Sequence, residues 1–453
     1  MKRKQTLKVG VSGVRGIVGD SLTPGLICGF AASFGEYLGQ GRVVVARDTR
    51  PTGEMVEHAV IAGLLSVGCQ PLLTGILPTP SAQILVDEEK ANGGIIISAS
   101  HNPVEWNALK FIGPSGIFLN HTEAAELLDV YNQPDTTYAK EQDYRRIKKI
   151  SNAFEYHKKR IFNRINIDAI RKAKFRVAID CCNGAGALYS RAFLEELGCE
   201  VISIFDEPDG LFRRPPEPVP ANIGRLCSVT AEKNCAIGFA QDPDCDRIAI
   251  VRDDGIPASE QLSIVLAAEH VLSKTPGTVV VNVQTTRAVE DIAVKYDSRV
   301  LYSKVGEINV TEKMLTENAV IGGEGGSGGV IWPAVHPCRD SFTAMALILE
   351  MMALRGKSIS SIINDIPAYF YSNKKIPCSA VSAQDIVRRL NAKYAALNPK
   401  SFDGIRIDFP DSWILVRPSN TEPVIRLTAE ALCEKASDEL IERFSSEISG
   451  LVS

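Results

Sequence analysis

Residues 42–53 read RVVVARDTRPTG, a short apolar run that stops at polar and turn-forming residues. Two later segments have the same organisation, namely RVAIDCCNGAG (176–186) and TVVVNVQTTRA (278–288). Each run is short and rich in valine or other apolar residues, which is typical of a strand buried on both faces. Three copies of one pattern indicate repeated structural units within the chain.

The residues that follow the first two runs also resemble each other. A helical stretch ends in LLSVGCQPLL (64–73) after the first run and in LEELGCEVIS (194–203) after the second. In both, Gly-Cys follows the last apolar turn, as expected for a glycine that ends a helix before the next strand. The third copy, VEDIAVKYDSRVLYSKVG (289–306), is looser. Strand–helix–strand repeats predict three related α/β domains with mixed, mostly parallel sheets.

Domain boundaries are expected where this pattern breaks. The charged stretch YAKEQDYRRIKKI (138–150) ends the first domain or forms a linking helix, and the turn DDGIPAS (253–259) follows the second. The segment NKKIPCSA (373–380) opens a module of helix, strand and helix without the repeated strand, which predicts a smaller α+β domain. The predicted domains are 1–150, 151–255, 256–370 and 371–453.

Composition agrees with a multidomain globular enzyme. The chain has 453 residues, enough for three or four domains at roughly 100–200 residues each. Its net charge is −4 and its pI is near 6.0, so nucleic acid is not an expected partner. No signal-peptide pattern or long apolar window is present, and the 11 cysteines lack metal-ligand spacing. We therefore expect no membrane association, and reduced thiols in a cytoplasmic protein.

The segment GGIIISASHNPVEWNALKF (93–111) places reactive side chains directly after an apolar strand. Ligands of open α/β folds bind at the carboxyl ends of such strands. Ser100 is a candidate nucleophile, although a serine hydroxyl needs a neighbouring base or charge to activate it, and His101 is adjacent. Pro103 disfavours helix at Asn102, so we expect an extended and exposed loop. A simple surface turn would explain the same residues.

The segment QDPDCDRIAIV (241–251) carries Asp242, Asp244 and Asp246 just before another strand. Side chains two residues apart point the same way in extended backbone. Three carboxylates on one side repel each other unless a cation neutralises them, and hard oxygen ligands favour Mg²⁺. Arg247 is available to hold a phosphate or a hydroxyl group. A polar turn without a metal is the alternative.

The glycine-rich segment GGEGGSGGVIWP (322–333) contains Glu324 and Ser327. Glycines let the backbone approach a ligand closely, and a carboxylate at such a place suits the hydroxyl groups of a sugar better than a phosphate. A flexible hinge without any contact to a ligand would have the same composition, so both interpretations stay open for this segment alone.

The segment RPSNTEPVIRL (417–427) concentrates donors suited to a phosphate. They are Arg417, Ser419, Asn420, Thr421 and Arg426. An ordinary turn seldom combines guanidinium, hydroxyl and amide donors in this way. Near the N-terminus, Arg15 lies between two glycines of VSGVRGIVG (11–19), a pattern that a plain glycine turn explains equally well.

Together these segments resemble the α-D-phosphohexomutase family, which includes phosphoglucomutases, phosphomannomutases and phosphoglucosamine mutases. The resemblance covers the whole chain, in the order and at the spacing of the family. It rests on SASHNPVEWNALK (98–110), DPDCDR (242–247), GEGGSGG (323–329) and RPSNTEP (417–423). It implies four domains around a central cleft, in agreement with the repeat pattern.

The resemblance also implies a role for each candidate residue. Ser100 looks like the phosphoserine, and Asp242, Asp244 and Asp246 look like ligands of Mg²⁺ that share it with an oxygen on Ser100. Arg15 and Lys110 are similar to the residues that flank the transferred group, with Lys110 a candidate general acid/base, and His101 resembles the family's active-site histidine. Contacts to the sugar correspond to Glu324 and Ser327. The clamp on the non-reacting phosphate corresponds to Arg417, Ser419, Asn420, Thr421 and Arg426. Arg247 stays a candidate substrate-binding residue on the strength of its chemistry and position.

The implied activity is interconversion of hexose or hexosamine 6-phosphate and 1-phosphate through a phosphoserine and a 1,6-bisphosphate, which is intermediate and activator. The chain departs from the family at Val11, Pro243 and Cys245, and its sugar loop is one residue longer and lacks a histidine. With VGEINV (305–310), it looks closest to the phosphoglucosamine mutases of archaea and some bacteria. A phosphomannomutase/phosphoglucomutase, a metal-dependent phosphatase and a non-catalytic sugar-phosphate sensor are the alternatives. We expect a small-molecule sugar phosphate as partner and a monomer or homodimer.

Overall fold

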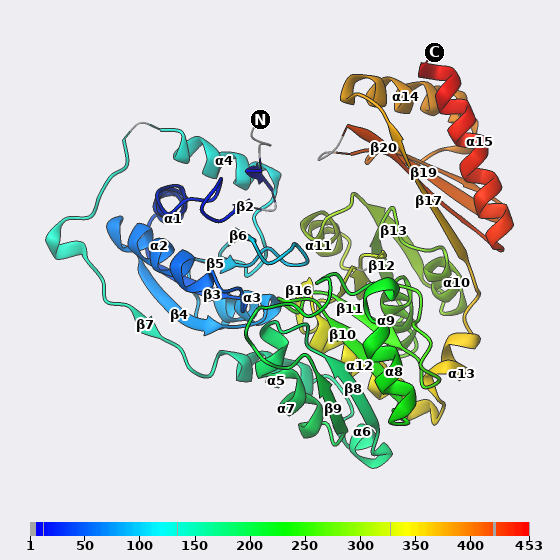
Figure 1. Ribbon diagram of the computed structural model, residues 1–453, viewed down its shortest axis with the longest axis horizontal. Helices are drawn as coiled ribbons and strands as arrows, with labels where there is room; N and C mark the ends of the chain where they lie inside the picture. The colour runs from blue at the N-terminus through cyan, green and yellow to red at the C-terminus, as the bar shows by residue number, and fades with distance from the viewer. Residues whose placement is uncertain (1–5, 12, 134, 327, 420–422, 453) are drawn as a thin grey trace.

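Four β-sheets follow one another along the chain, and each carries its own helices (Figure 1). The computed structural model describes residues 6–11, 13–133, 135–326, 328–419 and 423–452. Within these residues the sheets have seven, four, five and four strands. We refer to each sheet with its helices as a unit, from the first to the fourth. The expected fold class, three related α/β units and a smaller α+β unit, is confirmed.

The three apolar runs found in the sequence are inner strands of the first three sheets. Each pairs in parallel with the next strand of the chain on one side and with a later strand on the other. These triplets are β4-β3-β5, β9-β8-β10 and β13-β12-β14. Their bounds are β3 (Arg42–Arg47), β4 (Gln70–Ile76), β5 (Gly93–Ile97), β8 (Arg176–Asp180), β9 (Glu200–Ile204), β10 (Ile237–Gln241), β12 (Thr278–Asn282), β13 (Arg299–Ser303) and β14 (Ile321–Gly323).

In each of these units the third parallel strand is followed by an antiparallel one. The pairs are β5 with β6 (Trp106–Ile112), β10 with β11 (Ile248–Val251) and β14 with β15 (Val330–Trp332). The connection between the two strands therefore leaves the carboxyl end of a parallel strand in all three units. Ser100, the aspartate triplet and Glu324 lie in these three connections, so the repeat places them at equivalent positions.

The first sheet is extended at both edges. β2 (Gly13–Ile17) pairs antiparallel with β6, and β1 (Lys8–Gly10) pairs antiparallel with β2. At the other edge β7 (Lys148–Lys149) pairs in parallel with β4. The stretch 138–150 therefore ends as an edge strand and contains only one short 3₁₀ turn, Glu141–Asp143. A linking helix there was a wrong expectation, because many of its residues are charged and exposed, and no apolar face is available to pack one.

Helices connect the strands in the predicted order. In the first unit they are α1 (Pro24–Tyr37), α2 (Gly53–Ser66), α3 (Thr79–Glu88) and α4 (His121–Tyr131). Gly68 follows α2 with φ +82, and Gly198 follows α7 with φ +85, as the two Gly-Cys pairs predict. The remaining helices are α5 (Ala153–Phe162), α6 (Ile167–Ala173), α7 (Ser190–Glu196), α8 (Gly224–Glu232), α9 (Leu262–Leu272), α10 (Ala288–Lys295), α11 (Glu307–Thr316), α12 (Ser341–Arg355), α13 (Ile359–Asn364), α14 (Ala380–Lys393) and α15 (Glu434–Val452).

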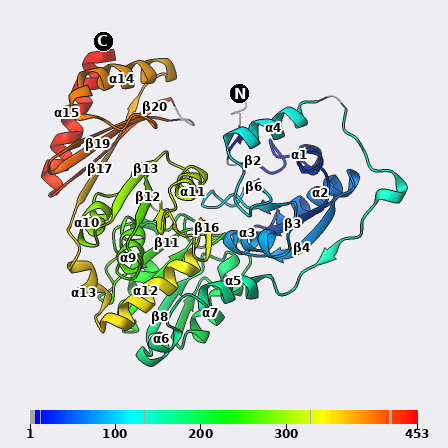
Figure 2. The ribbon, with the colours of Figure 1, turned by 180° about the vertical axis from the view of Figure 1, so that it is seen from behind.

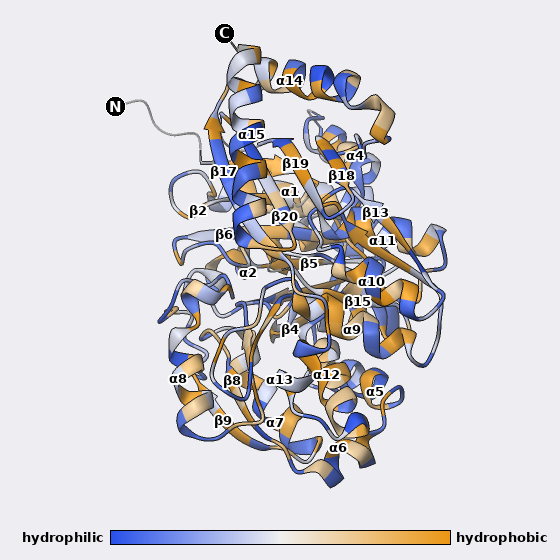
Figure 3. Cartoon of the chain, turned by 90° about the vertical axis from the view of Figure 1, so that its right-hand side faces the viewer, coloured by the Kyte–Doolittle hydropathy of each residue, from blue (hydrophilic) through white to orange (hydrophobic). Residues whose placement is uncertain are grey.

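One hydrophobic core runs through the first three units. Val44, Ile179 and Val281, each from the inner strand of its sheet, belong to the same buried cluster. The fourth unit has a core of its own, to which Ile414 and Phe444 contribute. Figure 3 shows hydrophobic and hydrophilic residues on both α14 and α15, as expected of helices that cover one face of a sheet. None of the described helices is both long and apolar enough to cross a bilayer.

The fourth sheet is antiparallel throughout, in the order β17-β20-β19-β18. Its strands are β17 (Phe370–Pro377), β18 (Ile405–Phe409), β19 (Ser412–Pro418) and β20 (Val424–Ala431). The sequence analysis expected one strand between two helices here, whereas the structure has a four-stranded sheet. Figures 1 and 2 both show the sheet beside β13 and α10 of the third unit.

The contact between the third and fourth units centres on Arg406. This side chain is fully buried, and its Nη1 donates to the carbonyl oxygens of Val283 and Thr285, both at 3.0 Å. Its guanidinium lies 4.1 Å from the ring centre of Trp413 and 4.6 Å from that of Tyr302. A residue of the fourth unit thus inserts into the third.

Candidate active site

The connection between β5 and β6 is a tight turn that buries the candidate nucleophile. Ser100 has φ +49 and is only 4% exposed. Its Oγ donates to Oδ2 of Asp242 at 2.8 Å, which joins the first unit to the second. The expected extended and exposed loop is therefore wrong at Ser100. The reason is local, because Asn102 N–H donates to the carbonyl of Ala99 and closes the turn.

Arg50 lies beneath this turn, and sequence reasoning missed it. The side chain is 1% exposed. Its Nη2 donates to the carbonyl oxygens of Ser100 and Asn102 at 2.6 and 2.7 Å. Its Nη1 donates to those of Pro103 and Trp106 at 2.5 and 3.0 Å. One guanidinium therefore binds four carbonyl groups of the serine loop.

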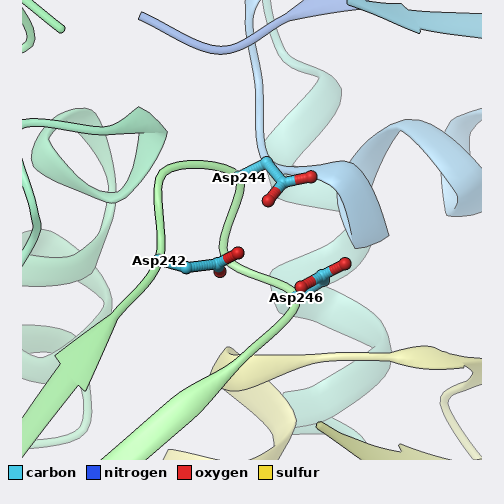
Figure 4. A group of neighbouring side chains, drawn as sticks. All are labelled: Asp242, Asp244 and Asp246. Atoms are coloured by element: carbon cyan, nitrogen blue, oxygen red, sulfur yellow. The ribbon is translucent and has the colours of Figure 1, made fainter. Parts of the chain in front are cut away.

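The aspartate triplet forms a single group of carboxylates (Figure 4). One oxygen from each of Asp242, Asp244 and Asp246 lies within 4.8 Å of the others, and all three residues are fully buried. The loop is a turn, with Cys245 at φ +62, so the carboxylates converge by curvature and not by extended alternation. Oδ1 of Asp244 and Oδ1 of Asp246 are buried and accept no hydrogen bond from the described residues.

The pKa values of two of these carboxylates are shifted in opposite directions. Burial, and then the charges of Asp246 and Asp244, raise the pKa of Asp242 well above its usual value. Burial would also raise the pKa of Asp244, but Lys110 and hydrogen bonds, one of them from Thr79 Oγ1, outweigh it and lower that pKa. Two buried carboxylate oxygens without hydrogen bonds and a hard donor set fit a small divalent cation such as Mg²⁺.

Lys110, on β6, is a cation that contacts two carboxylates of the triplet. Its Nζ lies 2.6 Å from Oδ2 of Asp244 and 3.7 Å from Oδ2 of Asp246. Burial acts to lower the pKa of Lys110, but the two carboxylates outweigh burial and raise it. The side chain is therefore a positive charge beside the Ser100 hydroxyl loop.

Arg15 and His101 lie on the same side of the site. Arg15, on β2, donates from Nη1 to Oδ1 of Asn102 at 2.7 Å. Burial, and then the nearby arginines led by Arg247, lower the pKa of His101 to about 2. Its imidazole is thus neutral at physiological pH, and within the described part of the chain its buried Nδ1 makes no hydrogen bond.

Arg247 contacts both the metal loop and a neighbouring loop. Its backbone N–H donates to Oδ1 of Asp242 at 3.2 Å, and its Nη1 donates to Oε1 of Glu217 at 3.2 Å. Its Nε lies 3.8 Å from Oδ1 of Asp246. The guanidinium is therefore fixed at the rim of the carboxylate group.

Arg339, whose side chain is 11% exposed, connects the metal loop to the glycine-rich loop. Its Nη2 lies 2.5 Å from Oδ2 of Asp246, and its Nη1 lies 3.0 Å from Oε2 of Glu324. Its Nε lies 3.1 Å from Oε2 of Glu307, a carboxylate whose pKa burial raises to about 7. Sequence reasoning missed both residues. Arg339 lies in none of the recognised motifs, and Glu307 lies in VGEINV (305–310), which was used only for the family resemblance. The only sequence signal for Arg339 is its place at the end of β16 (His336–Arg339), just before α12.

Glu324 is only 5% exposed and already holds several protein donors. Its Oε1 accepts the backbone N–H of Gly306 at 2.6 Å and Nδ2 of Asn282 at 3.0 Å. The carboxylate is therefore held in one orientation at the inner end of the glycine-rich loop. Ser327, the other predicted residue of this loop, lies outside the described residues.

Arg417 and Arg426, two of the predicted phosphate residues, lie on neighbouring strands of the fourth sheet. Arg417 on β19 is the register partner of Arg426 on β20. Arg417 Nε donates to Oδ1 of Asp403 at 3.0 Å, and Asp403 Oδ2 accepts the backbone N–H of Val305 at 2.9 Å. Asp403 therefore connects β19 to Val305 of the third unit, the residue before Gly306. Ser419 follows β19, whereas Asn420 and Thr421 lie outside the described residues.

Nearly the whole chain is similar to known proteins of one family. Family models for phosphoglucomutase/phosphomannomutase match residues 6–137 (alpha/beta/alpha domain I), 155–255 (domain II), 259–370 (domain III) and 377–448 (C-terminal domain). A probable phosphoglucosamine mutase of Methanopyrus kandleri is 34% identical, and a phosphoglucomutase/phosphomannomutase of Thermococcus kodakarensis is 35% identical; each match spans 96% of both chains. A phosphoglucomutase/phosphomannomutase family protein of Burkholderia thailandensis superposes with a TM-score of 0.85 at 25% identity, over 98% of both chains.

Proposed function

Because the chain belongs to the phosphoglucomutase/phosphomannomutase family of α-D-phosphohexomutases, it is a phosphotransferase of the isomerase class, and we propose that it converts glucosamine 6-phosphate to glucosamine 1-phosphate. One observation carries the reaction type: the Ser100 hydroxyl donates to Asp242 within a buried group of three carboxylates, beside Lys110. The name of the Methanopyrus kandleri relative supports the amino sugar.

We propose that Ser100 carries the phosphoryl group between two half-reactions. The O1 hydroxyl of the 6-phosphate attacks the phosphorus, the bond to Ser100 Oγ breaks, and a 1,6-bisphosphate forms. Lys110 donates a proton to the departing Oγ and then accepts the proton of O1, so the proton count is unchanged. The bisphosphate turns over and returns its 6-phosphoryl group to Ser100, which leaves the 1-phosphate. Positioning and charge neutralisation supply most of the catalysis of such a transfer.

We propose that Asp242, Asp244 and Asp246, with an oxygen on Ser100, hold Mg²⁺. The ion would neutralise the negative charge that develops on the transferred phosphoryl group. Lys110 and Arg15 add two fixed positive charges on the side of the first unit. The neutral His101 lies beside them and adds no further charge.

The other loops are proposed to hold the sugar and its second phosphate. Glu324 orients the hydroxyl groups or the 2-amino group of the sugar, with Arg247 at the rim of the site. The clamp of Arg417, Ser419, Asn420, Thr421 and Arg426 holds the phosphate that is not reacting. In this proposal the units 1–150, 151–255, 256–370 and 371–453 each supply one loop, and Ser327 belongs to the sugar loop. A cytoplasmic location and a monomeric or dimeric state remain predictions.

A coupled assay tests both the reaction and the substrate. It compares glucosamine, glucose and mannose 6-phosphates by kcat/KM. We expect the highest value for glucosamine 6-phosphate and no mutase activity in Ser100→Ala. The alternative, a phosphomannomutase/phosphoglucomutase, is supported by the name of the Thermococcus kodakarensis relative. A higher kcat/KM for mannose or glucose 6-phosphate would establish it. Near-normal turnover by Ser100→Ala would refute the phosphoserine.

A further inference from the structure

The Arg50 side chain and its partners form a cradle around the serine loop. Asp48 accepts Arg50 Nε at 3.0 Å, and the same Asp48 Oδ2 accepts Ser98 Oγ at 2.7 Å. Ser98 Oγ in turn accepts the backbone N–H of Ser100 at 3.0 Å. The amide of Ser100 is therefore held by Ser98 and its carbonyl by Arg50, on the two sides of the residue with φ +49.

This cradle fixes the direction in which the reactive part of the loop faces. The described peptide bonds are all trans, so each carbonyl points opposite to the N–H of the next residue. With the carbonyls of Ser100 and Pro103 directed at Arg50, the N–H groups of His101 and Val104 point away from it. A left-handed backbone at a non-glycine residue costs about 1–3 kcal/mol unless its surroundings impose it. Arg50 and Ser98 are surroundings of that kind.

The second unit closes over the cradle with a short segment, residues 210–214. The ring centre of Phe212 lies 4.9 Å from Arg50 Cζ. Gly210 lies so close to the first unit that an added Cβ would stand 2.2 Å from the carbonyl oxygen of Thr49. Thr49 Oγ1 also donates to the carbonyl of Asn183, at 2.7 Å. Arg50 is therefore covered by the unit that carries the aspartates.

The same segment ends in a second buried arginine that holds the metal loop. Arg214 is 7% exposed, and its Nε donates to Oδ2 of Asp180 at 2.7 Å. Its Nη2 donates to the carbonyl of Gln241 at 2.6 Å, directly before Asp242. Phe212 therefore contacts Arg50, which holds the Ser100 loop, and Arg214 binds the carbonyl of Gln241, the residue before Asp242. The two side chains lie two residues apart in the sequence.

We infer that Arg50 is a positioning residue for the Ser100 nucleophile, and that segment 210–214 holds the serine loop in register with Asp242 through Phe212 and Arg214. The inference rests on the proposed function, because it assigns these residues a task in the transfer through Ser100. None of them is required to touch the substrate. Their effect is on where Ser100 Oγ lies relative to the carboxylates and to the phosphorus that it exchanges.

The test exploits the difference between arginine and lysine. A lysine at position 50 keeps the charge but cannot present the planar fork that reaches four carbonyl groups. A displacement of the nucleophile by about 1 Å costs on the order of 100-fold in rate. We expect Arg50→Lys to lower kcat about 100-fold with KM changed less than threefold. We also expect the ratio of free phosphate released to 1-phosphate formed to rise at least about tenfold, because a misplaced loop admits water.

Arg160→Lys is the matched control. Arg160 joins α5 to α3 through Asp87 and Glu88, so it also links the first and second units, but it lies outside the site. We expect this variant to lower Tm while its kcat and its phosphate ratio stay as in the wild type. Equal kcat in Arg50→Lys and Arg160→Lys would overturn the inference.

Two further variants keep the outcomes distinct. Phe212→Leu removes the ring that lies over Arg50, at a half-buried position, and should lower kcat about tenfold. If Arg50→Lys does not fold, an unchanged kcat in Phe212→Leu overturns the inference. Ser100→Ala separates the two proposals. An active Ser100→Ala refutes the proposed function, whereas an inactive Ser100→Ala with wild-type kcat in Phe212→Leu and Arg50→Lys refutes only the positioning role.

Discussion

Replacing Arg406 with methionine is expected to loosen the fourth unit from the third by about 3–5 kcal/mol. The side chain is fully buried, and its Nη1 holds the carbonyls of Val283 and Thr285 across the contact. A hydrogen bond to a charged group contributes about 1.5–3 kcal/mol, and stacking on an aromatic ring adds about 0.5–2 kcal/mol. Packing of the methionine side chain recovers part of this sum.

Urea unfolding followed by tryptophan fluorescence measures this loss, because Trp413 stacks on Arg406. We expect an early transition in Arg406→Met that is absent from the wild type, together with a higher KM for the sugar phosphate as the clamp strands lose their place. Arg443→Met is the control. Arg443 belongs to the same unit and lies 5.5 and 5.4 Å from the ring centres of Phe409 and Phe444, but it is exposed. A loss in Arg406→Met within about 1 kcal/mol of that in Arg443→Met would refute the reasoning.

Three other predictions concern the metal, pH and thiols. Asp244→Asn should raise the Mg²⁺ concentration for half-maximal activity by about tenfold or more. The control, Asp254→Asn at an exposed position, should leave that concentration unchanged. An unchanged Mg²⁺ titration in Asp244→Asn would show that Asp244 is not a ligand. Burial lowers the pKa of His336 from 6.5 to about 4, so the neutral form is favoured in the fold. The contribution of the neutral His336 to the free energy of unfolding is therefore complete above pH 6.5. It decreases by about 3 kcal/mol as the pH falls toward 4. His336→Gln should flatten the unfolding free energy across that window, and an equal pH slope in both proteins would contradict this. Iodoacetamide should label the exposed Cys433 first and the buried Cys181 and Cys199 only after unfolding, because burial raises the pKa of both buried thiols. Mass spectrometry after a brief reaction with the native protein measures the labelling. Equal labelling rates of Cys181 and Cys433 would contradict the burial of Cys181.

Features encoded in short segments could be predicted from the sequence. The inner strands β3, β8 and β12 appear as apolar runs, and the helix ends at Gly68 and Gly198 appear as glycines after an apolar turn. Both signals arise from local geometry, so they can be read within about ten residues. The grouping of the three aspartates also followed from their spacing, although the backbone that brings them together is a turn.

Features that depend on distant partners could not be predicted in this way. The carbonyl of Ser100 accepts a hydrogen bond from Arg50, which lies 50 residues earlier in the chain. Arg339 reaches Asp246 across 93 residues, and no motif marks either end of that ion pair as a partner of the other. The fourth sheet was missed in part for the same reason, because β17 pairs with β20, which follows α14, β18 and β19 in the chain.

The three equivalent connections β5–β6, β10–β11 and β14–β15 divide the chemistry among copies of one scaffold element. Each copy has the same strand pairing, and under the proposed function each hairpin has a different task. Length and composition can therefore drift in one hairpin while the sheets and the other two tasks stay as they are. If the proposed function holds, changes in the third hairpin, one residue longer than the familiar family form, are expected to alter substrate preference first.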